Sequence, residues 1–390
     1  MIGPGEALAR LLALGAPVPL ETVPLVAAAG RWAAEPVDAL RTQPARDLSA
    51  MDGYAICHAD LPGPWRVTDE SAAGLPARSA LGAGEAIRIF TGATLPEGAD
   101  TILIQEDAAR VGDRLTLTGN PPRPGQHIRS AGCDFARHDR LIEPGDLLTP
   151  PRLGLAALAG HGTLAVRRRI RVALIATGSE LVPPGIDPGA DLLPNSNAPM
   201  LAALLAPLPV DVIDLGIVAD DRTALADAFA AARAHDVIVT TGGASVGDHD
   251  LVRPVLLEIG ATLDFWKIAM RPGKPLMAGT LRSAIVLGLP GNPVSAFVTA
   301  TLFLLPLIRH LSGARDPEPL RLGATLAAPL PPAESRTDYV RAVWQDGQVA
   351  PLGGDSGMLL PLAAATLLIE RPAGSPAARV GDRVTVISLA

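Results

Sequence analysis

The feature that most constrains the fold is a regular alternation of apolar strands and helices between residues 171 and 308. The expected strands cover 171–178, 210–218, 236–243 and 283–291, and the expected helices cover 195–208, 221–234, 250–260 and 293–308. Such an alternation builds right-handed strand–helix–strand units. It therefore predicts an α/β fold with a mostly parallel sheet and helices on both faces.

The sequence on either side of this block predicts β-rich modules. Short apolar runs separated by Gly, Pro and Asp fill residues 50–136, and short strands return from about residue 316. A basic run at 167–171 joins the first module to the α/β block, and we expect it to form a solvated face. The chain is therefore expected to be multidomain.

The composition excludes several classes of protein. The 390 residues are 48% hydrophobic and carry a net charge of −7, which allows large cores and argues against a nucleic-acid-binding surface. The uncharged stretch 283–308 is interrupted by Pro290 and Pro293, and it predicts a buried helix and no membrane span. Cys57 and Cys133 are too few for a disulfide framework, and no secretory leader is evident, so a cytoplasmic protein is expected.

Three of the expected strands end in unusual glycine-rich turns. Parallel strands place their carboxyl ends at one edge of the sheet, where ligands bind. Glycines let backbone N–H groups approach a ligand and a helix N-terminus favours an anion, so a phosphate-bearing ligand is expected, with plain turn geometry as the alternative. The candidate binding residues are Thr177, Gly178, Ser179, Gly242, Gly243, Ser245, Gly247, Asp248, Pro290, Gly291, Asn292 and Pro293.

The turns that follow the first three expected strands carry carboxylates that suit Mg²⁺. Glu180, Asp221 and Asp250 are the candidate metal ligands, and Asp220 lies next to the second of them. Mg²⁺ is a hard cation that proteins usually hold with a few carboxylates plus phosphate oxygens. Helix capping is the alternative role for Asp220, Asp221 and Asp250.

Lysine is unusually scarce in this chain. Of 33 basic side chains only two are lysines, Lys267 and Lys274, and they lie seven positions apart. A compact ammonium differs from a planar guanidinium, so lysine retained in an arginine-rich chain predicts a specific requirement, with chance as the alternative. Together with Arg271 they surround Pro272 and Gly273, and three cations in one loop suit a compact dianion or phosphate groups.

Taken together, the motifs resemble those of the molybdopterin molybdenumtransferase (molybdenum insertase) family, which is related to the E domain of gephyrin. The resemblance runs in family order from residue 49 to 358 and is carried by SAMDGYA, IFTGATLPEGAD, GQHIRSAG, ATGSEL, PNSNAPML, TTGGASVGDHD, FWKIAMRPGKP, GLPGNP and DSGM. It implies an elongated homodimer of four-domain subunits. Its domains would be an N-terminal linker and dimerisation domain (1–49 and 137–168), an inserted β-rich domain (50–136), a molybdopterin-binding α/β domain (169–315) and a C-terminal β domain (316–390).

The resemblance also implies a reaction and assigns residues to it. The family transfers molybdate to adenylylated molybdopterin with Mg²⁺ and releases AMP and molybdenum cofactor, at a site shared between subunits. The implied catalytic residues are Asp52, Thr91, Glu180, Asp221, Asp250, Lys267, Arg271 and Lys274. Arg341 and Ser356 match the contribution of the C-terminal domain. The upstream adenylyltransferase and downstream molybdoenzymes are the implied protein partners.

Two other functions remain open at the level of the sequence. A molybdopterin adenylyltransferase has the same type of α/β domain, although a stand-alone enzyme of that kind lacks the material at 49–136 and 316–390. A non-catalytic cofactor-binding scaffold is the second alternative. The chain also departs from the family where Cys133 replaces a common Glu, which places the role of that position in doubt, and Arg271 stands where some relatives have Lys.

Overall fold

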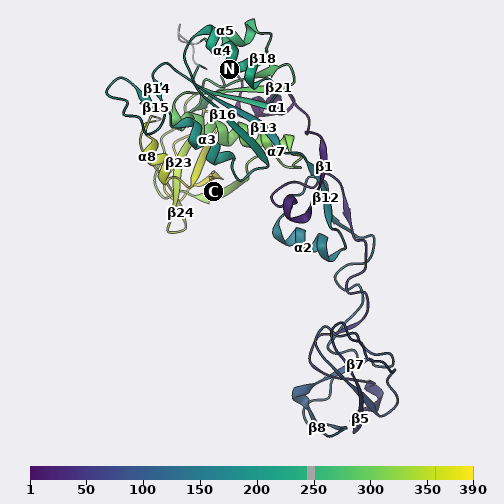
Figure 1. Cartoon of the computed structure of the whole chain (residues 1–390). Coiled ribbons are helices and arrows are strands. Elements are labelled where there is room, and N and C mark those ends of the chain that lie inside the picture. Colours follow the sequence, from purple (N-terminus) through teal and green to yellow (C-terminus); the bar gives the residue numbers. More distant parts are fainter. Residues whose placement is uncertain (244–250, 356, 390) are drawn as a thin grey trace.

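The computed structural model describes residues 1–243, 251–355 and 357–389. Figure 1 shows an elongated chain, with an α/β body at one end, a β module at the other and a narrow connecting region between them. This arrangement confirms the predicted multidomain α/β fold with β-rich modules on either side.

The α/β body is built on a six-stranded sheet in the order β16-β13-β17-β21-β20-β18. Its strands are β13 (Ile170–Thr177), β16 (Val210–Val218), β17 (Val237–Thr241), β18 (Thr262–Trp266), β20 (Met277–Leu281) and β21 (Ala284–Leu289). The four strands predicted from the apolar runs, β13, β16, β17 and β21, are parallel to one another. The two remaining strands were not predicted: β20 runs antiparallel to both β21 and β18 at the sheet edge.

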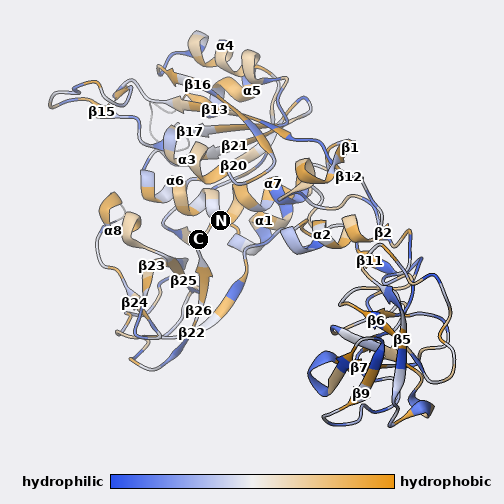
Figure 2. Cartoon of the chain, turned by 60° about the horizontal axis from the view of Figure 1, so that its bottom comes forward, coloured by the Kyte–Doolittle hydropathy of each residue, from blue (hydrophilic) through white to orange (hydrophobic). Residues whose placement is uncertain are grey.

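Helices cover both faces of this sheet. They are α3 (Asn197–Leu205), α4 (Arg222–Ala232), α5 (Val252–Glu258), α6 (Pro293–Thr299) and α7 (Leu305–Leu311). Side chains of β13 alternate between two cores, because Val172 and Leu174 pack with α3, α6 and α7 while Ala173 and Ile175 pack with α4 and α5. Figure 2 shows the mostly apolar strands of this sheet between the two helical layers.

The predicted helix at 293–308 is one continuous helical stretch from Pro293 to Leu311, with a π-helical segment, Ala300–Leu304, between α6 and α7. In a regular α-helix, the ring of Pro306 would clash with the backbone carbonyl four residues earlier. That carbonyl lies in the π-helical segment, where the regular α-helical hydrogen bonding is interrupted. The stretch is long and apolar enough to cross a membrane by length and composition alone. However, 78% of its apolar window is buried inside the protein, as expected for a core helix.

The connecting region contains a two-stranded ribbon of β1 (Leu20–Pro24) and β12 (Thr163–Arg167), followed by paired β2 (Val37–Asp38) and β11 (Arg140–Ile142). The helix α2 (Pro150–Leu158) and a 3-10 turn at Leu25–Ala28 pack beside them around a small apolar core. The first helix, α1 (Pro4–Leu12), contributes to the core of the α/β body and contacts α7.

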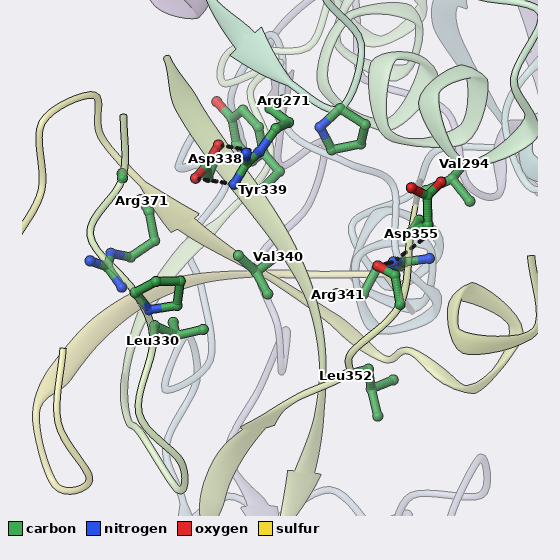
Figure 3. A pocket seen from close by; sticks show the side chains of 14 residues that line it. Arg271, Val294, Leu330, Asp338, Tyr339, Val340, Arg341, Leu352, Asp355 and Arg371 are labelled. Carbon is green, nitrogen blue, oxygen red and sulfur yellow. Dashed lines mark hydrogen bonds and ion pairs between the residues drawn. The ribbon is translucent and has the colours of Figure 1, made fainter. Parts of the chain in front are cut away.

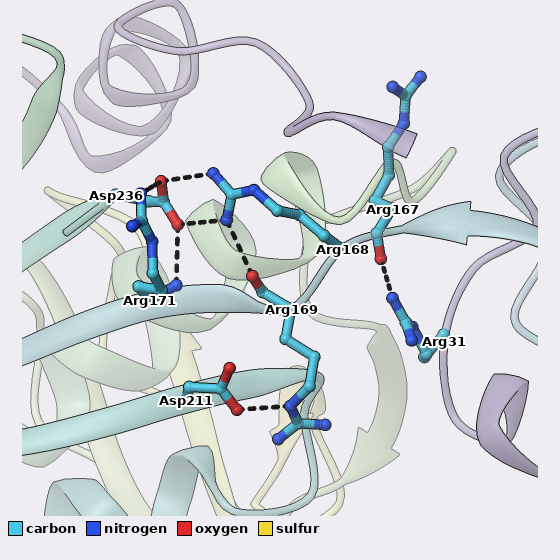
Figure 4. A network of polar contacts seen from close by, with 7 residues as sticks. All are labelled: Arg31, Arg167, Arg168, Arg169, Arg171, Asp211 and Asp236. Atoms are coloured by element: carbon cyan, nitrogen blue, oxygen red, sulfur yellow. Dashed lines mark hydrogen bonds and ion pairs between the residues drawn. The ribbon is translucent and has the colours of Figure 1, made fainter. Parts of the chain in front are cut away.

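The basic run at the junction of ribbon and body is partly solvated, as expected, because the side chains of Arg169 and Arg171 are exposed, but its arginines are also paired with carboxylates. Arg168 donates two hydrogen bonds to Asp236, of 2.7 and 2.8 Å, and the backbone and side chain of Arg171 donate to the same carboxylate. Arg169 pairs with Asp211 on the neighbouring strand (Figure 4). The run is therefore an ion-pair network that joins the ribbon to β13, β16 and the start of β17.

The inserted β module has a six-stranded sheet in the order β7-β4-β6-β5-β9-β8. Its strands are β4 (Gly53–Ile56), β5 (Trp65–Ser71), β6 (Glu85–Ile89), β7 (Thr101–Ile104), β8 (Ala108–Val111) and β9 (Arg114–Leu117). Short 3-10 turns lie at His58–Asp60 and Gln105–Asp107, and β3 (Leu48–Ser49) pairs with β10 (Ile128–Arg129) where the module joins the connecting region. One apolar core lies on each face of the sheet.

The C-terminal module is built on another mixed sheet, and it includes a strand from the α/β body. Its own strands are β22 (Arg321–Thr325), β23 (Thr337–Gln345), β24 (Gln348–Pro351), β25 (Leu367–Arg371) and β26 (Arg383–Ser388), with the short helix α8 (Leu359–Ala364) beside them. The order β19-β23-β25-β26-β22 places β19 (Met270–Arg271) at its edge. The loop that carries Arg271 is therefore fixed to both domains.

Candidate functional site

The carboxyl ends of β13, β17 and β21 bring three of the predicted glycine-rich turns together. The hydroxyl of Thr177 donates to the carbonyl of Thr241 at 3.3 Å, and the N–H of Gly242 donates to the carbonyl of Leu289 at 3.2 Å. The turns at Thr177, Thr241 and Leu289 therefore lie side by side, as their positions at the ends of parallel strands predict.

Close backbone contact between the turns requires glycine at Gly242, and it brings Gly291 into van der Waals contact with that residue. Gly242 has φ +91°, and a Cβ added there would lie 2.4 Å from the carbonyl oxygen of Thr177. A Cβ on Gly291 would lie 3.4 Å from the Cα of Gly242. The sheet edge is thus crowded by main chain, and backbone groups rather than side chains form its surface there.

The predicted acidic residues make two kinds of contact: Asp220 and Glu180 lie against the turn after β13, and Asp221 contacts the start of α4. Asp220 accepts a hydrogen bond from the N–H of Ser179 at 3.2 Å, and its own N–H donates to the Ser179 hydroxyl. Glu180 is exposed, and its carboxylate folds back over Gly178, since a Cβ there would lie 2.6 Å from the Glu180 Oε2. The carboxylates of Glu180, on the turn after β13, and of Asp220, on the turn after β16, therefore both lie beside Gly178 and Ser179.

Asp221 makes the contacts of a helix cap. One oxygen of its carboxylate accepts hydrogen bonds from the N–H groups of Thr223 and Ala224, both at 2.9 Å, at the start of α4. Among the described residues there is no group of three or more His, Cys, Asp or Glu side chains that could hold a metal ion. The predicted residues Ser245, Gly247, Asp248 and Asp250 lie outside the described residues.

Hydrogen bonds of two asparagine side chains hold the turn after β21. Asn292 caps α6 by accepting hydrogen bonds from the N–H groups of Val294 and Ser295, with Pro293 at the first helical position. Asn197, at the start of α3, donates to the carbonyl of Gly291 at 2.7 Å, although we had not selected it as a site residue. Asparagine is scarce in this chain, and this scarcity is the sequence feature that could have indicated Asn197.

The predicted cationic loop connects β18 to β20 at the same edge of the sheet. In the strand register Trp266 is opposite Met277, and Met277 is opposite Gly288 of β21, so the loop begins level with the end of β21. Lys267 has φ +76° and its ammonium lies 4.0 Å from the ring centroid of Trp266, while Lys274 is exposed.

Arg271 is paired with an aspartate from the C-terminal domain. Its Nε lies 3.0 Å from Oδ1 of Asp338 and its Nη2 donates to Oδ2 at 3.1 Å, a two-point contact. The side chain of Asp338 is only 12% exposed, and the two residues are opposite each other in the register of β19 and β23. The sequence did not predict Asp338 as a site residue, because the residue pattern of a strand does not show which other strand pairs with it.

A cavity of about 410 Å³ opens between the α/β body and the C-terminal module (Figure 3). Arg271, Asp338 and Arg341 line it, together with Tyr339 and Arg371. Burial and the neighbouring Glu370 raise the pKa of Tyr339 far above its usual value, so its hydroxyl remains a neutral donor to that carboxylate. Cations and polar groups from two domains thus meet at one hollow.

Arg341 organises the segment that carries the predicted Ser356. Its guanidinium is buried and donates hydrogen bonds to the carbonyls of Gly354, Asp355 and Met358, at 2.6, 3.1 and 2.8 Å. A Cβ on Gly357 would lie 3.9 Å from the side-chain nitrogen of Asn292, so this segment approaches the turn after β21 in the same chain. Ser356 itself lies outside the described residues.

Asp52 and Thr91 contact each other but lie in the inserted β module, away from the sheet edge of the same chain (Figure 1). The carboxylate of Asp52 accepts hydrogen bonds from the N–H and the hydroxyl of Thr91, at 2.7 and 2.8 Å, and these bonds lower the pKa of Asp52. Arg88, which sequence reasoning did not select, lies over the rings of both Tyr54 and Phe90 and further lowers that pKa. Within one chain this pair does not contact any of the other candidate residues that the structure describes (Figure 1).

Known protein families match this chain along most of its length. Three family models match in order: the MoeA N-terminal region (domain I and II) over residues 2–160, a probable molybdopterin binding domain over 173–310, and the MoeA C-terminal region (domain IV) over 323–389. The molybdopterin molybdenumtransferase of Haemophilus influenzae is 36% identical over 340 residues, which cover 85% of this chain and 84% of the relative. That of a Nostoc species is 35% identical over 389 residues, which cover 95% and 88%.

Solved structures also resemble this chain over its whole length. A molybdopterin biosynthesis MoeA protein from Pyrococcus horikoshii superimposes with a TM-score of 0.86 and 26% identity, and the match covers 100% of both chains. A second structure described for the same species gives a TM-score of 0.83 with 28% identity, covering 100% of this chain and 99% of the other. The order of domains, the full-length relatives and the shared architecture together show that this chain belongs to the MoeA family of molybdopterin molybdenumtransferases.

Proposed function

We propose that this protein is a molybdenum insertase that transfers molybdate to adenylylated molybdopterin in an Mg²⁺-dependent reaction and releases AMP and molybdenum cofactor. The observation that carries the proposal is that the cationic loop begins at the same sheet edge as the glycine-rich turns, while its Arg271 lines the cavity between the α/β body and the C-terminal module. Backbone turns of this kind suit phosphate groups, and clustered cations suit an oxyanion. Family membership supplies the chemical identity of the two substrates.

The cationic side chains supply electrostatic stabilisation. Water cleaves the phosphoanhydride, so that the phosphate stays with molybdopterin and AMP leaves. The two dithiolene thiols bind molybdenum, and their two protons leave with one molybdate oxygen as water. Lys267 and Lys274 hold molybdate or phosphate oxygens and offset the negative charge that develops at the anhydride. Arg271 contributes its outward-facing N–H groups, because its two bonds to Asp338 leave part of the guanidinium exposed.

The carboxylates at the end of β13 and the start of α4 fit Mg²⁺ by their chemistry. Mg²⁺ needs only one or two carboxylates from the protein when phosphate oxygens and water complete its shell. Glu180 is exposed at the turn, and Asp221 uses one carboxylate oxygen for capping and leaves the other for a ligand. Glu180 and Asp221, with Asp250, would hold the ion, which when bound would offset charge on the phosphoanhydride.

A homodimer would bring Asp52 and Thr91 to this site. The pair lies far from the sheet edge of its own chain, yet it is preformed by two hydrogen bonds in an exposed turn. We propose that it completes the site of a partner subunit. Co-expressing an Asp52→Asn chain with a Glu180→Gln chain should then restore activity, because a mixed dimer has one site free of both substitutions. No recovery in isolated mixed dimers would contradict the shared site.

The direct test is AMP release from adenylylated molybdopterin with and without molybdate and Mg²⁺. We expect release to require both. The variant Lys274→Arg should fold normally and lose most of its activity at limiting molybdate, because a guanidinium replaces a compact ammonium. Arg169→Lys is the matched control, since this residue lies in an exposed ion pair at the domain junction and should retain wild-type turnover.

Two outcomes would overturn the proposal, and a third would overturn the role of Lys274. ATP-dependent modification of unmodified molybdopterin would favour an adenylyltransferase, and full function in Glu180→Gln and Asp52→Asn would favour a binding scaffold. Wild-type turnover of Lys274→Arg at limiting molybdate would remove the proposed role of that lysine.

We place the reaction in the cytoplasm, in keeping with the free thiols of Cys57 and Cys133.

A further inference from the structure

Lys267 has a backbone conformation that an L-residue rarely adopts. Its φ of +76° lies in the left-handed region, which is costly for a side chain with a Cβ. Two backbone hydrogen bonds enforce it: the N–H of Lys267 donates to the carbonyl of Leu276, and the N–H of Ile268 donates to the carbonyl of Lys274, both at 3.0 Å. Conformations of this kind persist where the surrounding structure fixes them, and they concentrate at functional sites.

The ammonium of Lys267 rests on an aromatic face. Its Nζ lies 4.0 Å from the ring centroid of Trp266, and the guanidinium of Arg253 lies 4.9 Å from the same centroid. Tryptophan offers the strongest cation–π surface of the natural side chains. No ion pair joins either cation to a carboxylate within the described ranges 1–243, 251–355 and 357–389.

The same loop holds Arg271 in a different way. Asp338 binds that guanidinium at two points and offsets its charge. An aromatic ring carries no net charge, so it can orient an ammonium while leaving the full positive charge for a ligand. Among the residues that the structure describes, this loop therefore presents one cation paired with a carboxylate and one cation held by an aromatic ring.

We propose that Trp266 is a positioning residue for Lys267, and that its indole ring holds the ammonium ready for an oxyanion or phosphate group at the sheet edge. The left-handed backbone directs the side chain back over the residue that precedes it, which an extended backbone would direct to the opposite face. The proposal rests on the proposed function only for the class of ligand, an anion bound at this edge.

The scarcity of lysine gives a direct experiment. Full-length protein labelled with ¹³C at lysine Cε has only two lysine side-chain signals, which Lys267→Arg and Lys274→Arg assign. The ring current of Trp266 should displace the Lys267 signal upfield of that of Lys274. The displacement should vanish in Trp266→Leu, persist in part in Trp266→Phe, and remain in Trp344→Leu, a matched change at an exposed tryptophan of the C-terminal module.

Titration with molybdate gives the functional measurement. Trp266→Leu should bind molybdate about two- to five-fold more weakly, the change expected from losing one exposed cation–π contact, and Trp266→Phe should recover part of that affinity. An unchanged Lys274 signal reports that the loop remains folded. If Trp266→Leu cannot be purified folded, Trp266→Phe alone must show a reduced displacement and an intermediate affinity.

The outcomes separate this proposal from the insertase proposal. Wild-type protein whose Lys267 signal shows no upfield displacement or does not respond to molybdate, or a Trp266→Leu protein with wild-type affinity, would refute the positioning role. Molybdate binding that depends on Trp266, in a protein that releases no AMP from adenylylated molybdopterin, would support the positioning role and refute the insertase.

Discussion

The ion-pair network at the junction of ribbon and α/β body should stabilise the folded protein in a pH-dependent way. Burial alone would raise the pKa of Asp236, but hydrogen bonds from Arg168 and Arg171 outweigh it and lower that pKa from 3.8 to about 2. This difference corresponds to about 2 kcal/mol of stabilisation at neutral pH. Because the folded-state pKa is lowered, the stabilisation is complete above pH 3.8 and is lost as the pH falls through about 2.

Replacing Asp236 by Asn should therefore lower the free energy of unfolding of the α/β body by about 2 kcal/mol at pH 7. The deficit relative to wild type should shrink as the pH falls from about 4 to about 2. The control is Asp211→Asn, which breaks an ion pair whose aspartate is 61% exposed, and it should cost less than about 1 kcal/mol.

The protein has several domains, so a single unfolding transition cannot be assumed. Urea titrations at each pH should be read by a short deuterium pulse and mass spectrometry of peptides that cover β13 and β17, the strands next to the network. Equal stability of Asp236→Asn and Asp211→Asn at pH 7 would refute the reasoning. So would a deficit in Asp236→Asn that stays constant from pH 7 down to about 2.

Three further predictions concern the site. Gly242→Ala should destabilise the α/β body by about 2 kcal/mol or more in urea unfolding, because its Cβ would lie 2.4 Å from a backbone oxygen. Asp221→Ala should cost about 1 kcal/mol in the same assay without Mg²⁺, because α4 loses its cap; an unchanged midpoint would contradict capping. Arg341→Met should leave the fold intact but speed amide exchange over residues 352–360, because three hydrogen bonds to that segment are lost; wild-type exchange there would show that other contacts hold it.

The sequence was sufficient to predict the part of the site that depends on local pattern. Uninterrupted apolar runs predict β13, β17 and β21, and parallel pairing then necessarily brings the turns that follow to one edge. The edge strand β18 and its neighbour β20 escaped prediction because they are five residues each and are mixed with polar residues and glycine. A short run of that composition is equally compatible with a loop.

The basic run and Asp221 show a second limit of local reasoning. Arginines at a domain junction are usually solvated, and only the three-dimensional pairing with Asp236 and Asp211 shows that they form a network. An aspartate before a helix can serve as a cap or as a metal ligand, since either role needs the same side chain at the same place. Sequence alone therefore left both open, and the structure places two backbone N–H groups on one oxygen of that carboxylate.

The feature furthest from local pattern is the sharing of β19 between two domains, and it decides how the cavity is held. Residues 67 positions apart, Arg271 and Asp338, are opposite each other in a strand pair that no propensity specifies. Three residues further along β23, Arg341 holds the 354–358 segment. A single strand thus fixes both the cationic loop and the segment that approaches Asn292. Separating the two domains would break strand pairing and a half-buried ion pair together, so the cavity is preorganised, and a ligand that bound there would spend less of its binding energy in ordering it.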